Sequence, residues 1–358
     1  RFRMFWQGDL ILDLSREFLN TNGVRQQTTA FATALTEKSP DRLFASREPL
    51  PANPDQKTLL SRLKKEAASL NCCSKKGLIE MFDSTIGAAT VLMPLGGKHQ
   101  LTPALGMAAK LPLTQGDTQT ATLMTYGFDP ELSSESPYHG ALYAVIDSAA
   151  KIAGMGGDPS RARLSFQEYF EHLGSDPKRW GKPLSALLGA LRAQKELGIP
   201  SIGGKDSMSG TFMDLHVPPT LISFAVGTAS AGSILSPEIK GPGHQLALVY
   251  AERDSQGIID FAQFNANMRS VSQAISQGRI LSASTVGFGG LFMSLLKMCA
   301  GNGFGARITW PAETLLDKNY GALVVELAEG KAPEEALEGA CFRLIGASLE
   351  QAELVING

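Results

Sequence analysis

Hydrophobic residues along the chain follow two different periods, and their alternation predicts a mixed α/β architecture. Helical spacing, with apolar residues three and four apart, occurs at 57–70, 141–153, 184–197, 261–276, 291–300 and 334–338. Short apolar runs bounded by turn residues predict strands at 8–14, 121–127, 164–170, 220–227, 245–250, 279–283, 322–327, 341–345 and 353–356. Strands and crossover helices in both halves of the chain favour an α/β (α+β) fold over a helical bundle or a β-sandwich.

The pattern also makes two local predictions, one about a helix face and one about a turn. In the helix predicted at 184–197, Leu187, Leu188 and Leu191 are spaced to bury one face. The polar run at 132–136 predicts a turn.

The same pattern divides the chain into three segments. Residues 1–56 hold the first strand and a stretch rich in Pro, Arg and Asp, from Ser39 to Gln56, which predicts a mostly irregular linker. Small and polar residues dominate 228–236, so we expect a domain boundary there. The predicted domains are therefore 57–229 and 230–358.

A glycine-rich stretch follows the helix end at Gly198 and is the first candidate for chemistry. Its residues are Gly203-Gly204-Lys205-Asp206-Ser207-Met208-Ser209. Glycines let backbone N–H groups approach an anion, a lysine adds positive charge, and an aspartate can hold a Mg²⁺ that bridges phosphate oxygens. The spacing is not that of a Walker A loop. An ordinary surface loop explains these residues equally well.

Composition and charge narrow the classes of partner. The chain has 358 residues, of which 43% are hydrophobic and 19% charged, as in ordinary globular proteins. Its formal net charge of -2 implies no nucleic-acid-binding surface. No apolar run approaches the ~20 residues that span a membrane, and no signal peptide opens the chain. The four cysteines show no zinc spacing, so we expect reduced thiols in a cytoplasmic protein.

Two groups of charged residues stand out within the predicted elements. Asp147 and Lys151 are four apart on a helix and face the same way, as a surface ion pair would. Their small or apolar neighbours, such as Ala144 and Ile152, favour instead a pair that lines a crevice. Lys75 and the adjacent Lys76 are most simply explained as part of a solvated face.

Several motifs occur in an order that is more specific than any one of them. They are Cys73-Ser74-Lys75 eight residues before Asp83, Pro137-Tyr138-His139-Gly140-Ala141, the stretch 203–209, Gly241-Pro242-Gly243-His244, and Ser282-Ala283 followed by Gly289-Gly290-Leu291. Together they resemble phosphoribosylformylglycinamidine (FGAM) synthase, of the aminoimidazole ribonucleotide (AIR) synthase-like superfamily. The resemblance covers nearly the whole chain and looks closest to the second synthetase half of the single-chain form.

The resemblance implies a C–N bond-forming ligase of purine biosynthesis. The family converts formylglycinamide ribonucleotide to the amidine, using ATP, Mg²⁺ and ammonia from glutamine. The implied fold is an AIR synthase-like N-terminal domain, whose sheet pairs with a second copy into a barrel, plus a smaller α/β C-terminal domain. The implied partners are the first synthetase half and the glutaminase domain. The isolated chain is expected to be inactive and to form a homodimer.

The resemblance also assigns residues to a nucleotide site. Lys75 matches a family lysine that faces nucleotide phosphates. The loop contributes Gly203, Gly204, Lys205, Asp206, Ser207 and Ser209 to an ATP or ADP site. Asp147 and Asp206 match the region of the metal site. Tyr138 and His139 are candidates for contact with substrate or with the opposite half, although a lone histidine is more often structural.

Three positions depart from the family pattern. Gly127 and Phe288 stand where the family has acids, and Lys151 replaces an Asn-type metal ligand. We therefore hypothesise that the Lys151 ammonium occupies the Mg²⁺ position between Asp147 and Asp206. This half is then structural or auxiliary and holds no catalytic residue. Two alternatives remain, a scaffold that binds no nucleotide and another ATP-dependent member of the superfamily.

Overall fold

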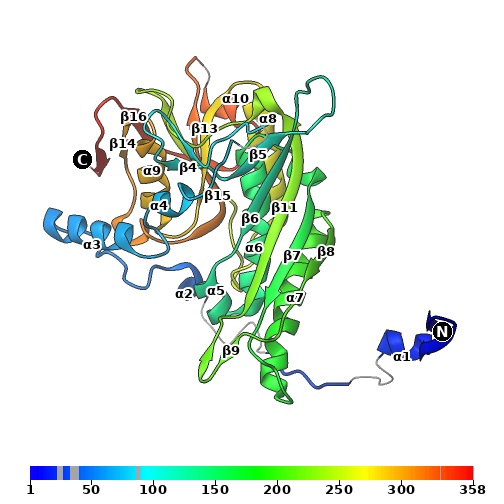
Figure 1. The fold of residues 1–358 in the computed structure, drawn as a ribbon. Coiled ribbons are helices and arrows are strands. Elements are labelled where there is room, and N and C mark those ends of the chain that lie inside the picture. Colours follow the sequence, from blue (N-terminus) through cyan, green and yellow to red (C-terminus); the bar gives the residue numbers. More distant parts are fainter. Residues whose placement is uncertain (22–26, 33–39, 86–88, 331, 358) are drawn as a thin grey trace.

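Two β-sheets with helices packed against them form the main body of the protein (Figure 1). This computed structural model describes residues 1–21, 27–32, 40–85, 89–330 and 332–357. Parts of the predicted segment 1–56, at 22–26 and 33–39, lie outside the described residues. The mixed α/β fold predicted from the hydrophobic pattern is confirmed.

The first sheet has five strands in the order β5-β6-β11-β7-β8. Their bounds are Gly106–Lys110 (β5), Thr120–Gly127 (β6), Thr220–Ser230 (β11), Arg163–Tyr169 (β7) and Ser201–Lys205 (β8). All neighbours are antiparallel except β7 and β8, which are parallel and are joined by helix α7. Helices α6 (Pro137–Gly154) and α7 (Pro177–Leu197) pack against this sheet.

The second sheet has six strands in the order β13-β15-β12-β16-β14-β17. The strands are Gln245–Val249 (β12), Ile280–Val286 (β13), Gly305–Ile308 (β14), Asn319–Leu327 (β15), Phe342–Leu349 (β16) and Leu354–Ile356 (β17). The helices of this half are α8 (Phe261–Ser276), α9 (Gly290–Ala300) and the short α10 (Pro333–Ala336). Each predicted strand and helix of residues 245–356 has its counterpart here.

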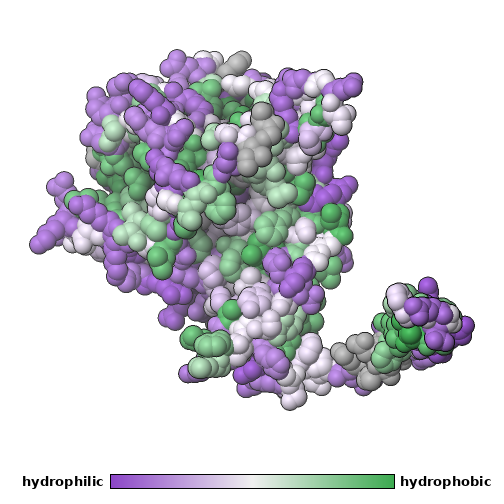
Figure 2. Space-filling model, viewed as in Figure 1, coloured by the Kyte–Doolittle hydropathy of each residue, from purple (hydrophilic) through white to green (hydrophobic). Residues whose placement is uncertain are grey.

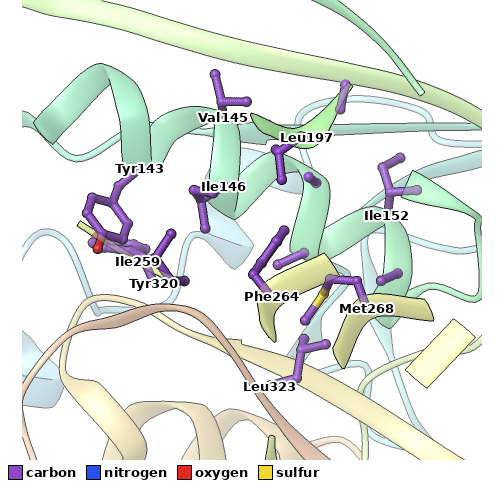
Figure 3. Close-up of a cluster of buried hydrophobic side chains, with 14 of the residues drawn as sticks. Tyr143, Val145, Ile146, Ile152, Leu197, Ile259, Phe264, Met268, Tyr320 and Leu323 are labelled. Atoms are coloured by element: carbon purple, nitrogen blue, oxygen red, sulfur yellow. The ribbon is translucent and has the colours of Figure 1, made fainter. Parts of the chain in front are cut away.

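Helix α6 joins the two predicted domains. Its first turn is capped by the Ser136 side chain, and nearly all of its residues are buried. Because most of its side chains are small or apolar, it can pack against both sheets. Tyr143, Ile146 and Ile152 belong to the same buried cluster as Phe264 and Leu323 of the second half (Figure 3). One hydrophobic core therefore spans residues of both predicted domains.

Helix α7 corrects one prediction. Its leucines were expected to face the core, yet Leu187, Leu188 and Leu191 are 46%, 46% and 51% exposed. The buried face consists instead of small residues, among them Gly189 and Ala190. A Cβ on Gly189 would lie 2.1 Å from the carbonyl oxygen of Tyr138. Helices α6 and α7 approach so closely that only small residues fit between them, which leaves the larger leucines outside.

Two local predictions were wrong. Residues 132–136 were expected to form a turn, but Pro130–Glu135 is helix α5, whose first backbone N–H groups are capped by the Asp129 carboxylate. The glycine-rich stretch was expected to be a loop from its start, but Ser201–Lys205 is strand β8. Gly204 belongs there because a Cβ would lie 2.4 Å from the Phe166 carbonyl oxygen of the neighbouring strand.

The remaining elements are short or lie toward the N-terminus. They are β1 (Phe2–Trp6), β2 (Asp9–Leu14), α1 (Arg16–Thr21), α2 (Pro40–Phe44), α3 (Gln56–Ala68), α4 (Lys76–Ile79), β3 (Leu95–Gly96), β4 (Thr102–Pro103), β9 (Thr211–Phe212) and β10 (Leu215–His216). Helix α3 confirms the helix predicted at 57–70, and α2 lies within the stretch predicted as a linker.

Exposed apolar side chains gather at several places among the described residues (Figure 2). One is the β1–β2 hairpin, where Phe5 and Trp6 are 61% and 66% exposed. Another is the five-stranded sheet, where Met124 and Tyr126 are 41% and 56% exposed. Within the described residues, none of the helices is both long and apolar enough to span a membrane.

Candidate functional site

The candidate site is a cleft of two adjoining cavities, with volumes of about 730 Å³ and 220 Å³. The larger is bordered by the connection between α3 and α4, by β5 and by α9. The smaller continues over α6 and β13. Five residues line both cavities: Asn71, Pro103, Ala104, Tyr126 and Lys297. The cleft therefore lies where the two sheet regions meet.

Asp147 and Lys151 form a buried ion pair in the smaller cavity. The Lys151 Nζ lies 2.6 Å from the Asp147 Oδ2 and also donates a hydrogen bond of 2.7 Å to the Tyr126 carbonyl oxygen. Asp147 is only 4% exposed. Burial raises the pKa of its carboxyl group above the usual range, while the Lys151 charge acts in the opposite direction. Of the two alternatives for this pair, the geometry is that of a pair lining a crevice.

Gly127, between Tyr126 and Phe128 of the cleft lining, packs against helix α6. A Cβ at this position would lie 2.1 Å from the Ala144 carbonyl oxygen, because helix α6 rests directly on the end of β6. No acidic side chain fits here with α6 in this position. Glycine in place of the family's acid is therefore consistent with the close packing of α6, the helix that carries Asp147.

A second group of charges, which the sequence did not point to, lies nearby. The Lys318 Nζ lies 2.7 Å from the Asp129 Oδ2 and 2.8 Å from the Glu131 Oε2, and the Tyr320 hydroxyl donates to Asp129 at 2.9 Å. The ammonium also lies 4.6 Å from the ring centroid of Phe288. Lys318 is 189 residues from Asp129, so no spacing along the sequence could have shown this contact.

Lys75 lines the larger cavity from the segment before α4. Its Nζ donates to the Leu70 carbonyl oxygen and lies 3.1 Å from the Cys73 Sγ. Both partners are neutral groups close in sequence. Lys75 therefore brings a positive charge to the cleft without a carboxylate among its own hydrogen-bond partners.

The glycine-rich stretch lies elsewhere. Gly203, Gly204, Lys205 and Asp206 are exposed, and the hydroxyls of Ser207 and Ser209 lie 2.9 Å apart. None of residues 203–209 lines either cavity of the cleft. Asp206 forms no ion pair with Lys151 or with any other described residue. The structure thus brings Lys151 to Asp147 but does not bring Asp206 to them.

His139 and Tyr138 occupy the first turn of α6. The His139 Nδ1 lies 2.8 Å from the Ser136 Oγ, and its Nε2 lies 2.8 Å from the Gln256 carbonyl oxygen. The side chain is buried, which lowers its pKa. The Tyr138 ring meets the imidazole edge-on, with centroids 5.5 Å apart. Both imidazole nitrogens therefore have partners within the chain, and the Nε2 contact links α6 to the second half.

The acidic side chains near the cleft are not arranged to hold a metal ion. Among the described residues, no group of three or more His, Cys, Asp or Glu side chains is placed to hold a metal ion. Asp147, which lines the cleft, and the buried Asp129 near it already face lysine ammonium groups. The residues present therefore do not fit a Mg²⁺ ion held by the chain alone.

Comparison of folds shows what this chain is similar to in structure. A chain of the HypE–HypF complex matches with a TM-score of 0.50 and 15% identity, covering 70% of this chain and 89% of that chain. Thermotoga maritima PurL complexed with ATP matches with a TM-score of 0.61 and 15% identity, covering 97% of this chain and 48% of that one. No family model matches the sequence.

Sequence comparison finds similarity to FGAM synthase subunits. The phosphoribosylformylglycinamidine synthase subunit PurL of Thermus thermophilus is 23% identical over 379 residues, which cover 99% of this chain and 46% of the relative. The corresponding subunit of Thermoplasma acidophilum is 22% identical over 370 residues. This chain resembles the FGAM synthase subunits in sequence and in fold, as its motifs predicted. It spans about half the length of the curated relatives that it matches.

Proposed function

We propose that this chain is the auxiliary synthetase half of an FGAM synthase. The complete enzyme would convert formylglycinamide ribonucleotide to the amidine with ATP and glutamine, and the metal-dependent step would take place outside the cleft described above. Similarity to PurL over nearly the whole chain supports the enzyme class. The single observation that carries the auxiliary role is the buried Asp147–Lys151 ion pair.

The physical argument concerns charge. Mg²⁺ in a phosphate-transfer site needs carboxylate oxygens that are free to bind it. An ammonium group 2.6 Å from Asp147 repels a divalent cation and already neutralises the carboxylate. Lys318 does the same for Asp129. A domain with such a cleft can stabilise the first synthetase half without turning over a nucleotide itself.

The proposed partners are the first synthetase half and the glutaminase domain. The sheet face that carries Met124 and Tyr126 exposes apolar side chains on adjacent positions of one face of β6. Burial of such a face against a second AIR synthase-like sheet is favourable. In the absence of the first half, two copies of this chain would meet through the same face as a two-fold dimer. Sedimentation at micromolar concentration tests this, since a clean monomer contradicts it.

Turnover measurements test the auxiliary role. The purified chain is supplied with formylglycinamide ribonucleotide, ATP, Mg²⁺ and ammonium, alone and together with a separately expressed first synthetase half. We expect no ADP release from the chain alone and substrate-dependent release from the mixture. Release by the chain alone would contradict the auxiliary role. Release that needs both halves but not this substrate would point to another ATP-dependent activity of the superfamily.

A second candidate function is a scaffold whose cleft holds no nucleotide. It is favoured by the position of residues 203–209 outside the cleft. The auxiliary-site version is favoured by Lys75, and T. maritima PurL itself has been crystallised with ATP and with ADP. Calorimetry with ATP or ADP separates the two, because a pure scaffold gives no binding heat.

A further inference from the structure

The β1–β2 hairpin has one apolar face and one charged face. Four apolar side chains share a face because the strand pairing sets them opposite each other, Phe2 with Leu14 and Met4 with Leu12. Arg3 and Asp13 are opposite each other on the other face, where the Arg3 Nε lies 3.4 Å from the Asp13 Oδ1. The hairpin therefore presents one face suited to water and one suited to a hydrophobic core.

The main body does not cover this hairpin. Its two buried apolar clusters contain none of the described residues among 1–32. In the ribbon view, β1, β2 and α1 lie apart from the two large sheets (Figure 1). Among the described residues, the strand pairing and the ion pairs of residues 1–14 join β1 to β2.

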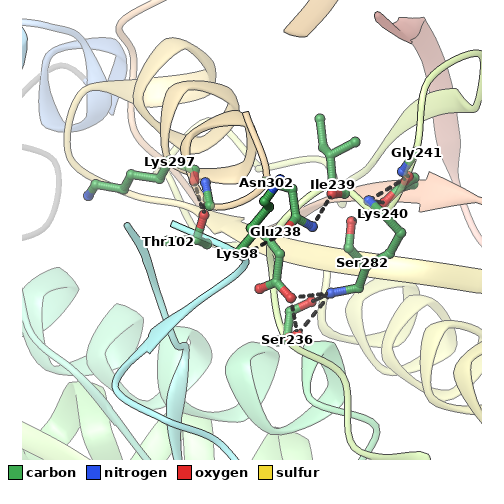
Figure 4. A network of polar contacts seen from close by, with 12 residues as sticks. Lys98, Thr102, Ser236, Glu238, Ile239, Lys240, Gly241, Ser282, Lys297 and Asn302 are labelled. Atoms are coloured by element: carbon green, nitrogen blue, oxygen red, sulfur yellow. Dashed lines mark hydrogen bonds and ion pairs between the residues drawn. The ribbon is translucent and has the colours of Figure 1, made fainter. Parts of the chain in front are cut away.

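Segments of the main body, by contrast, are joined by polar contacts over long distances in sequence. The Asn302 side chain accepts from the Lys98 N–H at 2.8 Å and donates to the Ile239 carbonyl oxygen at 2.8 Å (Figure 4). Three separate segments meet at this one residue. The contacts described for residues 1–14 include none of this kind, so the hairpin is not fixed to the body in the same way.

An apolar face of this kind needs a covering layer. A two-stranded hairpin alone is marginally stable in water, and it becomes stable when a further strand or a packed layer is added. Phe2, Met4, Leu10 and Ile11 of the hairpin are all exposed. So many exposed apolar side chains on so short a segment are typical of a surface that another protein region covers.

We propose that residues 1–14 pack with their apolar face on the first synthetase half and become part of its hydrophobic core. This inference rests on the proposed function, which supplies that partner. The match to the T. thermophilus subunit covers 46% of that relative, so the complete enzyme has enough additional chain to cover the hairpin. A second copy of this chain would offer only the same body surfaces, which do not cover the hairpin here.

The composition of the hairpin defines the surface that it fits. The face with Phe2 and Met4 requires an apolar helix or sheet surface. Arg1 and Arg3 both face the Asp13 carboxylate, at 2.5 Å and 3.4 Å, so the opposite face would remain in water. This contact is separate from the sheet face that carries Met124 and Tyr126. The chain would therefore hold the first half at two places.

Hydrogen exchange tests the proposal in the unmodified chain. The amides of residues 1–14 are followed alone and after addition of a first synthetase half that ends before this hairpin. We expect fast exchange alone and at least about tenfold slower exchange in the mixture, because packing protects a marginal hairpin. The amides of β12 are the internal control and should not change. Fast exchange of residues 1–14 in both samples would overturn the proposal.

Met4→Gln and Arg3→Gln form a matched pair of variants. They place the same side chain at neighbouring positions of β1 that point to opposite faces. Met4→Gln should weaken binding of the first half at least about tenfold in biolayer interferometry, and Arg3→Gln by about twofold or less. Both parent residues are exposed, so both variants should melt at the temperature of the parent chain. Equal affinities of the two variants would contradict the docking.

The outcomes separate this inference from the auxiliary role. A protected hairpin without ADP release supports the docking and counts against the proposed activity. Release by the mixed halves with an unprotected hairpin overturns only the docking, and failure of the halves to associate overturns both. A dimer of the chain alone that Met4→Gln disrupts and Arg3→Gln does not would assign the hairpin to a second copy, which also overturns the proposal.

Discussion

The sequence predicts that Asp147 and the stretch 203–209 belong to one phosphate and metal site, yet the two have opposite environments in the structure. Asp147 is 4% exposed and paired with Lys151 at 2.6 Å. Asp206 is exposed and forms no ion pair with a described residue. Two aspartates that the same family resemblance singles out therefore differ in burial and in pairing. In the cleft, both the charged residues and the packing of α6 differ from the family pattern. In the stretch 203–209, the residues match the family pattern, but no described side chain forms an ion pair with Asp206.

The pairing of Asp147 with Lys151 gives the largest expected effect. Lys151→Met leaves a buried carboxylate without its partner and should lower the free energy of unfolding by about 3–5 kcal/mol at pH 7. Urea unfolding measures the change. The double variant Asp147→Asn with Lys151→Met removes the charge as well and should recover most of the loss. A single variant that costs under about 1 kcal/mol would show that the pair is not effectively buried.

The same variant should have a characteristic pH dependence. Burial raises the pKa of Asp147 in the folded state above its unfolded value. For such a group, the folded state binds the proton more tightly, so its contribution to stability is present at low pH and is lost as pH rises through the folded pKa. The deficit of Lys151→Met relative to the parent should therefore shrink as pH falls. A deficit that grows toward acid would reverse the sign of the argument.

Alanine substitutions at Gly127, beside the cleft, and at Gly203, in the exposed stretch, compare the two regions by their packing. A Cβ on Gly127 would lie 2.1 Å from the Ala144 carbonyl oxygen, whereas a Cβ on Gly203 would meet nothing within 4 Å. Gly127→Ala should destabilise the protein by about 1–3 kcal/mol, because α6 must shift off β6. Gly203→Ala is the matched control and should stay within about 0.5 kcal/mol. Thermal unfolding of both variants checks this, and equal melting temperatures would contradict it.

The elements of the fold were largely predictable because they depend on local patterns. The helix at 261–276 and the strand at 121–127 appear where apolar spacing and turn residues placed them. Helix α7 shows the limit, since the burial of Gly189 instead of Leu187 depends on how closely α6 approaches. Only contacts between distant parts of the chain could decide which face is covered.

The cleft was predictable only in part. The spacing of Asp147 and Lys151 predicted their ion pair, because residues four apart lie on the same side of a helix. Lys318 and Lys297 come from elements far along the chain and carry no local motif. Their roles depend on which acids and cavities the folded chain brings to them, and single-sequence patterns do not contain that information.

Asp206 gives the smallest expected effect and tests the other side of the comparison. Asp206→Asn should change stability by no more than about 0.5 kcal/mol, because the side chain is exposed and unpaired among the described residues. ADP affinity should also be unchanged, since residues 203–209 line neither cavity. One local change is expected. Burial raises the pKa of Glu168, and the charge of Asp206 adds to that shift.

Removal of the Asp206 charge should therefore lower the pKa of Glu168 toward its ordinary value, which NMR titration of the carboxyl carbon can follow. A lowered pKa of Glu168 would show that the substitution has a local electrostatic effect even if the free energy of unfolding and the ADP affinity are unchanged. A tenfold loss of ADP affinity with unchanged stability would instead show that the stretch reaches the ligand. The two regions would then belong to one site in the bound protein, and the contrast between them would hold only for the chain without ligand.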